Sequence, residues 1–517
     1  MTVKSCRPRR WTGALAAASV AVAGCAVPLA SPPSPPASAS SPQPPGTPQA
    51  PVTRPGASDA TPRQPAMVKE GWFGFGSHAR LEIQHVERHP DKSVLRFFVT
   101  SLAEQATVPS FGVAGVAGRA NLHFMLVDPV GRKLYYPLYD DTETTVGSQA
   151  SASEPGVRYE AVLHFPPVPA HVTTLTVVSP GTAGEFTGVP VADAPPGTTP
   201  GPLGTPAWPV FQPQGQPRGE VHDLYDVVED PESTTVTGSS DKTIALRTDV
   251  LFAFDSDRLT AKAKAELDDL AGAMRQEAAS PVHIEGHTDG KGSHDYNADL
   301  SLRRARAVHA QLQARLGTGH QYQTEGKGET EPVAKEGGAD DAQARRRNRR
   351  VEISYRLRQP GGTPAPTEYG RAARFRERDG ETVASREADF ADNRRRIDVK
   401  PFYRDGRYLV AVFDITNLGP SHVSWMFAYP GATGGTFGSF GVLDPATGRL
   451  YRGVRVGPDK ANDYEDAFVD PGRAHFRLEP GTTNRGFMYV PAPPANVTSV
   501  TFDAGEFGRI PGIPIRD

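Results

Sequence analysis

Short segments of alternating apolar and polar residues run through much of the chain. Arg80-Leu81-Glu82-Ile83 has the period of two that is typical of a half-buried β-strand, and residues 93–99 form a second apolar segment of strand length. Gly, Pro and Asp separate such segments at short intervals, as they do in antiparallel β-sandwiches. This pattern predicts an all-β domain over residues 69–193.

The same pattern returns near the C-terminus. Residues 80–83, 126–129 and 184–186 recur, with similar residues in the same order, as 396–399, 442–445 and 505–507. This internal repeat predicts two related all-β sandwich (immunoglobulin-like) domains, the second over residues 369–517. The repeated residues belong to turns and cores, and no nucleophile with its base recurs, so we expect no catalytic residue. The acidic run from Asp140 to Glu143 lacks the spacing of a calcium loop, and we expect a solvated loop there.

Between the two repeats, the periodicity changes. Residues 250–254 form an apolar run that predicts a buried strand, and Thr260 is a candidate N-cap for a helix that buries Ala263 and Leu267. A second strand is expected at 282–284 and a second helix from about Asn297. Two more strands are expected, at 321–324 and 350–355. The order βαβαββ predicts a central α+β domain with helices on one face of a sheet.

Four sequence blocks of this central region carry a family resemblance. They are Gly286-His287-Thr288-Asp289, Tyr296-Asn297 through Arg304-Ala305, the run from Gly326 to Pro332, and the basic stretch from Arg345 to Glu352. In this order and spacing they resemble the OmpA-like peptidoglycan-binding domain (OmpA and peptidoglycan-associated-lipoprotein type). We assign residues 219–358 to it. The resemblance implies a non-enzymatic domain that binds peptidoglycan.

The resemblance also implies which residues bind the ligand, the diaminopimelate of the peptidoglycan stem peptide. In this family the carboxylate at the position of Asp289 receives the ligand's ammonium, and the guanidinium at the position of Arg304 receives its carboxylate. Five further residues match positions near that ligand: Asp255, Thr288, Asn297, Asn348 and Arg349. Taken alone, the Asp289–Arg304 pair would favour a structural salt bridge across a loop, and it is the surrounding motif that favours ligand binding.

Two features of this region differ from the family pattern or suggest other chemistry. The loop from 335 to 344 is rich in Gly and Asp where the family commonly has an Asn, and Ala344 replaces the usual Gly. His283 and His287 could indicate a metal, but no Cys, Asp or Glu accompanies them at ligand spacing in the sequence. We therefore expect no metal site and no cofactor.

The N-terminus has the pattern of an export signal. A basic start is followed by an apolar run too short to span a bilayer, and the run ends in Val22-Ala23-Gly24-Cys25, which resembles a bacterial lipobox. The only other cysteine, Cys6, would leave with the signal (residues 1–24), so Cys25 is the expected lipidation site. An ordinary signal peptide is the alternative. Residues 25–68, rich in Pro, Ser and Ala, are expected to be a disordered tether.

Composition limits the remaining possibilities. With 517 residues, several domains are expected, and much of the content of 50 Pro and 52 Gly falls in the tether and in two expected linkers, 194–218 and 359–368. The formal net charge of −3 argues against nucleic acid as a partner. The excess of Arg over Lys is similar to that of proteins from high-GC actinobacteria.

These observations predict an exported envelope lipoprotein that links a membrane to peptidoglycan. The lipid would lie in the outer membrane of a diderm, or on the outer face of the plasma membrane of a monoderm. The main alternative is an adhesin or envelope-assembly factor whose β-sandwiches bind other envelope proteins, with the central domain as a wall anchor. A flagellar stator protein would need a transmembrane helix with an ionisable residue, which the sequence lacks. A cell-wall hydrolase would need paired carboxylates or a Ser/Cys–His arrangement, and none stands out.

Overall fold

The computed structural model describes residues 67–74, 76–111, 122–253, 255–338, 341–358, 370–391, 393–424, 427–429, 431, 435–457 and 468–516. The expected signal, Cys25, nearly all of the expected tether and the expected linker at 359–368 lie outside these residues. Within the described residues no helix combines the length and apolarity needed to cross a membrane. The chain is mostly β-sheet with few helices, and residues 64–517 form one compact unit.

The described residues of the N-terminal β-region form eight strands: β1 (Met67–Trp72), β2 (His78–Arg88), β3 (Ser93–Ser101), β4 (Met125–Asp128), β5 (Lys133–Tyr135), β6 (Arg158–Phe165), β7 (Thr174–Val178) and β8 (Glu185–Asp193). One sheet has the order β1-β2-β3-β6, and a second has the order β5-β4-β7-β8, all antiparallel. The end of β8 also pairs in parallel with β2. Apolar side chains from both sheets, among them Phe97 and Phe186, form one buried core.

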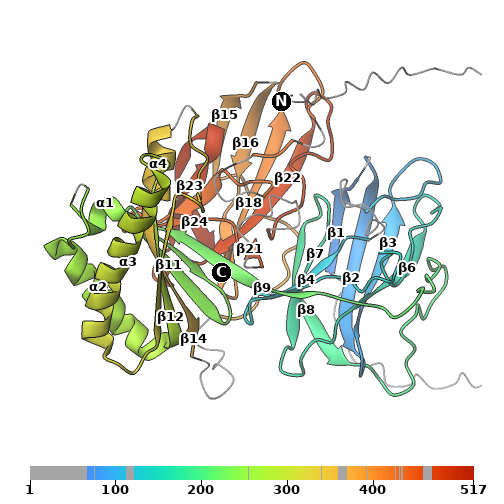
Figure 1. The fold of residues 1–517 in the computed structure, drawn as a ribbon. Helices are drawn as coiled ribbons and strands as arrows, with labels where there is room; N and C mark the ends of the chain where they lie inside the picture. The colour runs from blue at the N-terminus through green and yellow to red at the C-terminus, as the bar shows by residue number, and fades with distance from the viewer. Residues whose placement is uncertain are drawn as a thin grey trace, which may run out of the picture. The chain divides into compact units, whose positions relative to one another are not determined.

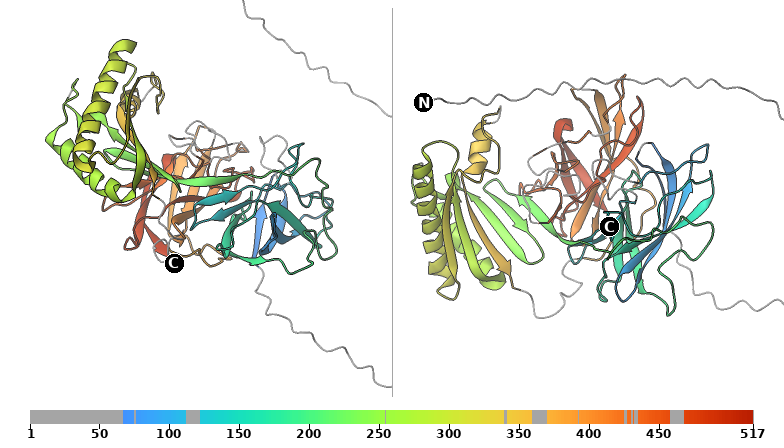
Figure 2. Two further views of the ribbon diagram at one scale, coloured as in Figure 1. Left: turned by 60° about the horizontal axis from the view of Figure 1, so that its bottom comes forward. Right: turned by 45° about the vertical axis from the view of Figure 1, so that its right-hand side comes forward.

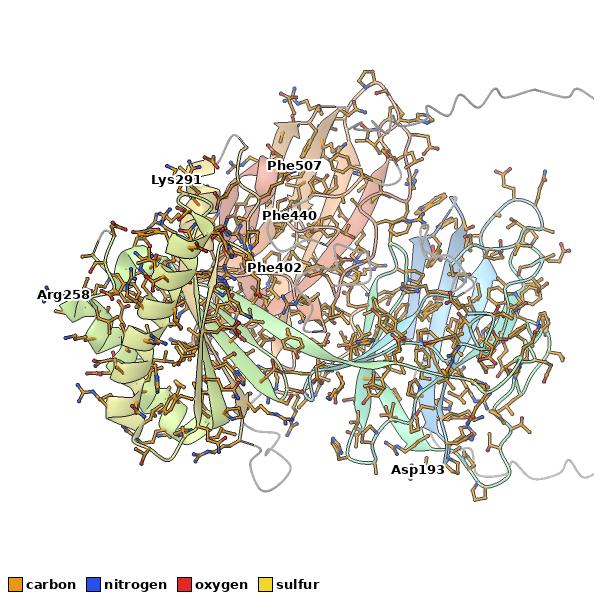
Figure 3. The ribbon with its side chains drawn as sticks, viewed as in Figure 1. Asp193, Arg258, Lys291, Phe402, Phe440 and Phe507 are labelled. Carbon is orange, nitrogen blue, oxygen red and sulfur yellow. The ribbon has the colours of Figure 1, made fainter. Side chains whose placement is uncertain are left out.

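The C-terminal β-region repeats this pairing order. Its elements are β15 (Ala384–Asp389), β16 (Arg394–Val399), β17 (Phe402–Asp405), β18 (Tyr408–Asn417), β19 (Phe440–Leu443), β20 (Leu450–Tyr451), β21 (Arg455–Val456), β22 (Thr483–Pro491), β23 (Ser499–Ala504), the short 3-10 helix η2 (Gly505–Phe507) and β24 (Arg509–Arg516). β15-β16-β18-β22 form one sheet and β20-β19-β23-β24 the other, with β17 parallel to β24. Phe402, Phe440 and Phe507, labelled in Figure 3, belong to its core.

Residues 194–218, the first expected linker, pack against the N-terminal β-region, and we call them the covering segment. The Arg96 guanidinium on β3 donates to the carbonyl oxygens of Thr199 and Gly201, both at 2.8 Å. The Glu160 carboxylate on β6 accepts from the backbone N–H of Leu203 at 3.1 Å. Trp208 is only 1% exposed and joins the core. A segment read as a linker from its Pro and Gly content thus covers one face of a sheet.

The two β-regions contact each other through different faces. Apolar residues on β4, β5 and β7 of the first region and on β17, β18 and β22 of the second form a shared buried cluster that includes Met125, Val127, Tyr136, Val178, Tyr403, Val410, Val412, Phe487 and Tyr489. The strands used by the second region correspond to β2, β3 and β6 of the first. The contact is therefore head-to-tail with respect to the repeat.

Buried charges accompany this apolar contact. Arg485 on β22 pairs with Glu185 on β8 at 2.7 Å and with Asp379 at 2.6 Å. The Lys69 ammonium donates to the backbone oxygen of Glu185 at 2.7 Å. Burial alone would raise the pKa of the Glu185 carboxyl, but Arg485 and Lys69 outweigh burial and lower its pKa. Charge pairs of this kind fix one relative placement of two surfaces.

The central region contains β9 (Val221–Glu229), β10 (Ser233–Thr237), β11 (Asp241–Arg247), α1 (Thr248–Leu251), α2 (Ala261–Glu277), β12 (Ala278–His287), α3 (His294–Leu316), β13 (Tyr322–Gly328), α4 (Asp341–Asn348) and β14 (Arg350–Leu357). Its sheet has the order β9-β10-β11-β14-β12-β13, in which only β12 and β13 are parallel. Helices α2 and α3 cover one face of this sheet, which the right-hand view of Figure 2 shows nearly edge-on (Figure 1 gives the labels).

The expected strand at 250–254 is wrong. Thr248–Leu251 forms the short helix α1, and Phe252 makes a single bridge to Leu259. The strand that comes directly before this run is β11, where Ile244 is buried and its neighbours are half-buried. The apolar run is buried all the same, with Leu251 and Phe252 in the domain's core. Periodicity cannot distinguish a short buried strand from a buried helical turn.

The N-caps and the close packing of α3 place the loops of this domain. Thr260 accepts from the N–H of Ala263 at 3.0 Å as predicted, and α3 begins one turn earlier than expected because Ser293 caps it. A Cβ on Gly286 would lie 2.1 Å from the carbonyl oxygen of Ser301, so glycine is required for this close approach. The approach brings the end of β12 next to the first turns of α3.

Strand β9 lies within the expected domain (219–358) and joins the central sheet to both β-regions. It pairs with β10 of the central sheet, with β5 of the N-terminal β-region, and with β20 and β21 of the C-terminal β-region, always antiparallel. Sequence periodicity gave no indication of these shared pairings, because they depend on strands that lie far away in the chain.

Candidate functional site

Asp289 lies in the loop between β12 and α3. Its Oδ2 pairs with Nη1 of Arg349 at 2.7 Å, and its Oδ1 accepts from the backbone N–H of Lys291 at 3.2 Å. The carboxylate is 13% exposed and the Arg349 side chain 33% exposed. Both charges therefore keep some access to solvent and to a ligand. Figure 3 shows Lys291, two residues after Asp289, at the α4 end of the domain.

Arg304 lies on the buried face of α3 and is 6% exposed. Its Nε donates to the backbone oxygen of Ser256 at 3.0 Å, and its guanidinium carbon lies 5.4 Å from the centre of the Phe252 ring. Burial lowers the pKa of Arg304, while Asp255 acts in the opposite direction. A guanidinium remains charged throughout the physiological range, so this one is a partly desolvated cation.

Asp255 follows the α1 helix and is exposed. Its backbone has φ of 51°, in the left-handed region that few residues other than glycine adopt. The Tyr296 hydroxyl donates to its Oδ1, and this hydrogen bond raises the pKa of Tyr296. Strained backbone of this kind is common at binding sites, where the surrounding structure holds it.

Thr288 and Asn297 hold the Asp289 loop in place through hydrogen bonds. The backbone N–H of Thr288 donates to the oxygen of Gly328 at 2.9 Å, and the Asn297 amide donates to the backbone oxygen of Asp289 at 3.4 Å. The Thr288 side chain is buried, at 5% exposure, and its Oγ1 has no hydrogen-bond partner among the residues that the structure describes.

Asn348 uses its whole amide within the protein. Its Oδ1 accepts from the N–H groups of Val333 and Ala334 at 3.0 and 2.9 Å. Its Nδ2 donates to the Ala334 oxygen at 2.8 Å and to the Glu336 carboxylate at 2.7 Å. At 1% exposure it fixes the loop before α4 and the position of Arg349 beside it.

The structure thus assigns the predicted residues to two acid–base groups. Asp289 pairs with Arg349, and within the described part of the chain no ion pair joins Asp289 to Arg304. Arg304 has Asp255 as its main negative neighbour instead. The salt bridge considered as the alternative for Asp289 exists, but with a different arginine. Sequence reasoning missed Tyr296, although the aromatic residue belongs to the same motif, and Glu336.

His287 requires a correction. The sequence suggested no carboxylate near it, yet one ligand atom each from His287, Glu285 and Glu352 lie within 4.8 Å of one another. Cations already occupy both carboxylates: Arg350 pairs with Glu352 at 2.7 Å, and Lys327 lies 3.9 Å from Glu285. Burial, together with neighbouring carboxylates, raises the pKa of Glu285. The group is a compact charge cluster on the sheet face opposite the helices.

Comparison with known proteins identifies this region. The sequence model described as "OmpA family" matches residues 251–347. The peptidoglycan-associated lipoprotein of Pseudomonas aeruginosa is 36% identical over 127 residues, 23% of this chain and 71% of that protein. Outer membrane protein A of Bordetella avium is 36% identical over 110 residues, 21% of this chain and 55% of that protein.

One solved structure is similar to part of the chain. The cell wall anchor of the type VI secretion system from Pseudomonas aeruginosa is 30% identical, with a TM-score of 0.23, over 25% of this chain and 89% of that chain. Several relatives are much longer in full, and the chain spans between 13% and 55% of their length.

Proposed function

The chain belongs to the OmpA family, and we propose that it is a non-enzymatic cell-envelope protein that binds peptidoglycan through the diaminopimelate of the stem peptide. The observation that carries the proposal is the pair of acid–base groups, Asp289–Arg349 and Asp255–Arg304, at neighbouring loops of the OmpA-like region. The free end of diaminopimelate carries one ammonium and one carboxylate. A site with both charge signs at fixed positions can bind both.

Each residue has a specific part in this proposal. Asp289 would receive the ammonium, and Asp255 lies near Arg304. The planar guanidinium of Arg304 would receive the carboxylate, with Arg349 next to Asp289. The buried Thr288 hydroxyl has no hydrogen-bond partner among the described residues, whereas Asn297 and Asn348 position the loops.

The test compares two adjacent arginines. Arg304→Ala and Asp289→Ala should each weaken binding to purified sacculi by about ten- to a hundredfold, because each removes a charge-assisted hydrogen bond. Arg303→Ala is the matched control, since the Arg303 side chain is 41% exposed and pairs with Asp299 on the same helix and with Asp257 before α2. The losses should not add in the double variant. Undiminished binding by both single variants would refute the proposal.

Membrane attachment through an acylated Cys25 completes the proposed role. The support is the Val22-Ala23-Gly24-Cys25 sequence, together with the absence of other cysteines after the expected signal. Cys25→Ser should move the protein from the detergent phase to the aqueous phase in phase partitioning. An unchanged distribution between the two phases would refute the lipid anchor, and with it the proposed link between membrane and wall. It would not affect the proposal that the protein binds the wall.

We also propose that the two β-regions are related immunoglobulin-like sandwiches. Their shared strand pairing order supports this. An adhesin or assembly factor, with these regions bound to other envelope proteins, is the second candidate. Cross-linking in intact cells distinguishes the two candidate functions. If a variant deficient in wall binding still cross-links to another envelope protein through its β-regions, the adhesin or assembly factor is favoured.

A further inference from the structure

Glu336 lies shortly before α4, in the stretch of residues 335–344 that departs from the family pattern. Its two carboxylate oxygens each lie 3.2 Å from the backbone nitrogen of Gly290, which donates to them. Its Oε1 also accepts from Nδ2 of Asn348 at 2.7 Å. One side chain from this divergent loop therefore connects two motifs that are almost sixty residues apart.

These contacts close a ring around the site. Asn348 is bonded to Arg349 in the chain, Arg349 pairs with Asp289 at 2.7 Å, and Asp289 is bonded to Gly290. Gly290 then donates to Glu336, which accepts from Asn348. Two peptide links and three polar contacts thus fix the Asp289 loop against the corner between α4 and β14.

The ring has one fixed side and one adjustable side. Asn348 is 1% exposed and anchored by the N–H groups of Val333 and Ala334, so it cannot move without breaking this loop. Glu336 is half-buried, and Gly290 has no side chain to fix its own position. The Glu336 carboxylate is consequently what couples the anchored amide to the loop that carries Asp289.

We propose that Glu336 is a positioning residue for peptidoglycan binding: it holds the Gly290 N–H, and through it orients the Asp289 carboxylate toward the ligand's ammonium. This inference rests on the proposed function. It assigns to a residue outside the family motif a share of the affinity. A preorganised carboxylate binds more tightly than a mobile one, because less conformational freedom is lost on binding.

A glutamine substitution separates positioning from direct charge contact. The single carbonyl oxygen of Gln can occupy the place of Oε1 and accept from both Gly290 and Asn348, but it carries no charge. Glu336→Gln should therefore keep nearly all sacculus binding. Glu336→Ala should weaken it by about three- to tenfold, the effect of one or two lost hydrogen bonds. Lys335→Ala, at the exposed neighbouring residue, is the control and should bind like the wild type.

Two further measurements use the full-length chain. In an Asp289→Ala background, Glu336→Ala should cause no additional loss of binding, because it acts through Asp289. In the absence of any ligand, hydrogen exchange at the Gly290 amide should become about three- to tenfold faster in Glu336→Ala and stay slow in Glu336→Gln and Lys335→Ala.

The outcomes that contradict the inference are distinct from failure of the proposed function. Equal losses of binding in Glu336→Ala and Glu336→Gln would mean that the charge itself contacts the ligand, and would overturn the positioning role. Unchanged Gly290 exchange in Glu336→Ala would also overturn it. If the wild type fails to bind sacculi, the proposed function is wrong, whereas the exchange data still establish whether Glu336 holds the loop.

Discussion

Asp289 forms its ion pair with Arg349, at 2.7 Å, and Arg304 instead contacts the Ser256 backbone beside Asp255. Two cations and two anions therefore stand in the region of α3 and the loops around it, each partly neutralised within the protein. A zwitterionic ligand can replace these contacts with its own without leaving a buried charge unpaired. This favours binding, because an unpaired buried charge costs several kcal/mol.

Gly286→Ala should destabilise the protein. Its Cβ would lie 2.1 Å from the Ser301 oxygen on α3, and overpacking of this kind costs about 1–3 kcal/mol. Gly272→Ala is the matched control, because that glycine lies within α2 with no other atom near its Cβ position. It should stabilise the helix by about 0.5–1 kcal/mol. Urea denaturation measures both, and a neutral Gly286→Ala would show that α3 lies farther from β12.

Thr288→Val should separate stability from binding. The buried Oγ1 of Thr288 has no hydrogen-bond partner among the described residues, so replacing it with a methyl group leaves the folded protein as stable or up to about 1 kcal/mol more stable. Sacculus binding should fall about three- to tenfold if the hydroxyl serves the ligand. Unaltered sacculus binding together with raised stability would show that the Thr288 hydroxyl does not contact the ligand.

His475 should make the C-terminal β-region sensitive to acid. Burial, helped by the nearby Arg395 cation, lowers the pKa of His475 from 6.5 to about 3. The unfolded chain binds a proton below pH 6.5 and the folded chain does not until about pH 3, so stability falls as the pH decreases between these values. The loss is roughly 1.4 kcal/mol per pH unit, or about 3 kcal/mol at pH 4.5.

Denaturation at pH 7 and pH 4.5 checks this acid sensitivity. His475→Gln should show a difference in stability between the two pH values that is smaller by about 3 kcal/mol than in the wild type. His171→Gln, at an exposed histidine, should retain the wild-type difference. An identical pH dependence in the wild type and in His475→Gln would show that His475 does not titrate in this way.

Glu185→Gln should weaken the contact between the two β-regions. It leaves the buried Arg485 with only Asp379 as a carboxylate partner, and breaking a buried ion pair costs about 3–5 kcal/mol. Glu70→Gln, in an exposed pair with Arg80, is the control and should cost less than about 1 kcal/mol. Thermal unfolding measures both. Equal small effects would mean that Arg485 is stabilised by Asp379 alone.

The motif residues could be located from the sequence because their spacing within a single helix, or directly after a single strand, determines their position. Asn297 and Arg304 are seven residues apart and so share one face of α3. Asp289 follows a strand, as expected. Its partner could not be predicted, since Arg349 directly precedes β14, and the pairing of β12 with β14 joins residues about seventy positions apart. The ring through Glu336 was hidden for the same reason.

The repeat was visible in the sequence, but its consequences for packing were not. The turn residues Asp128 and Asp444 occupy equivalent places, and each accepts backbone N–H groups in its turn. Which faces are covered depends on non-repeated residues. The Pro and Gly content of the covering segment indicated a linker. Its tryptophan, Trp208, was the residue that could have indicated packing against the N-terminal β-region, where it is only 1% exposed.

The head-to-tail contact of the β-regions raises the question of why the stack ends after two β-regions and does not continue with those of other molecules. A contact between unlike faces can propagate indefinitely, as it does in a fibre. At the positions equivalent to Met125, Tyr136 and Val178, which form the apolar contact surface of the first copy, the second copy has Gly441, Arg452 and Asp503. At the other end, the covering segment closes the face of β3 and β6. Neither end of the stack therefore offers the face that a further copy would need, and this protects the chain against polymerising through its head-to-tail contact.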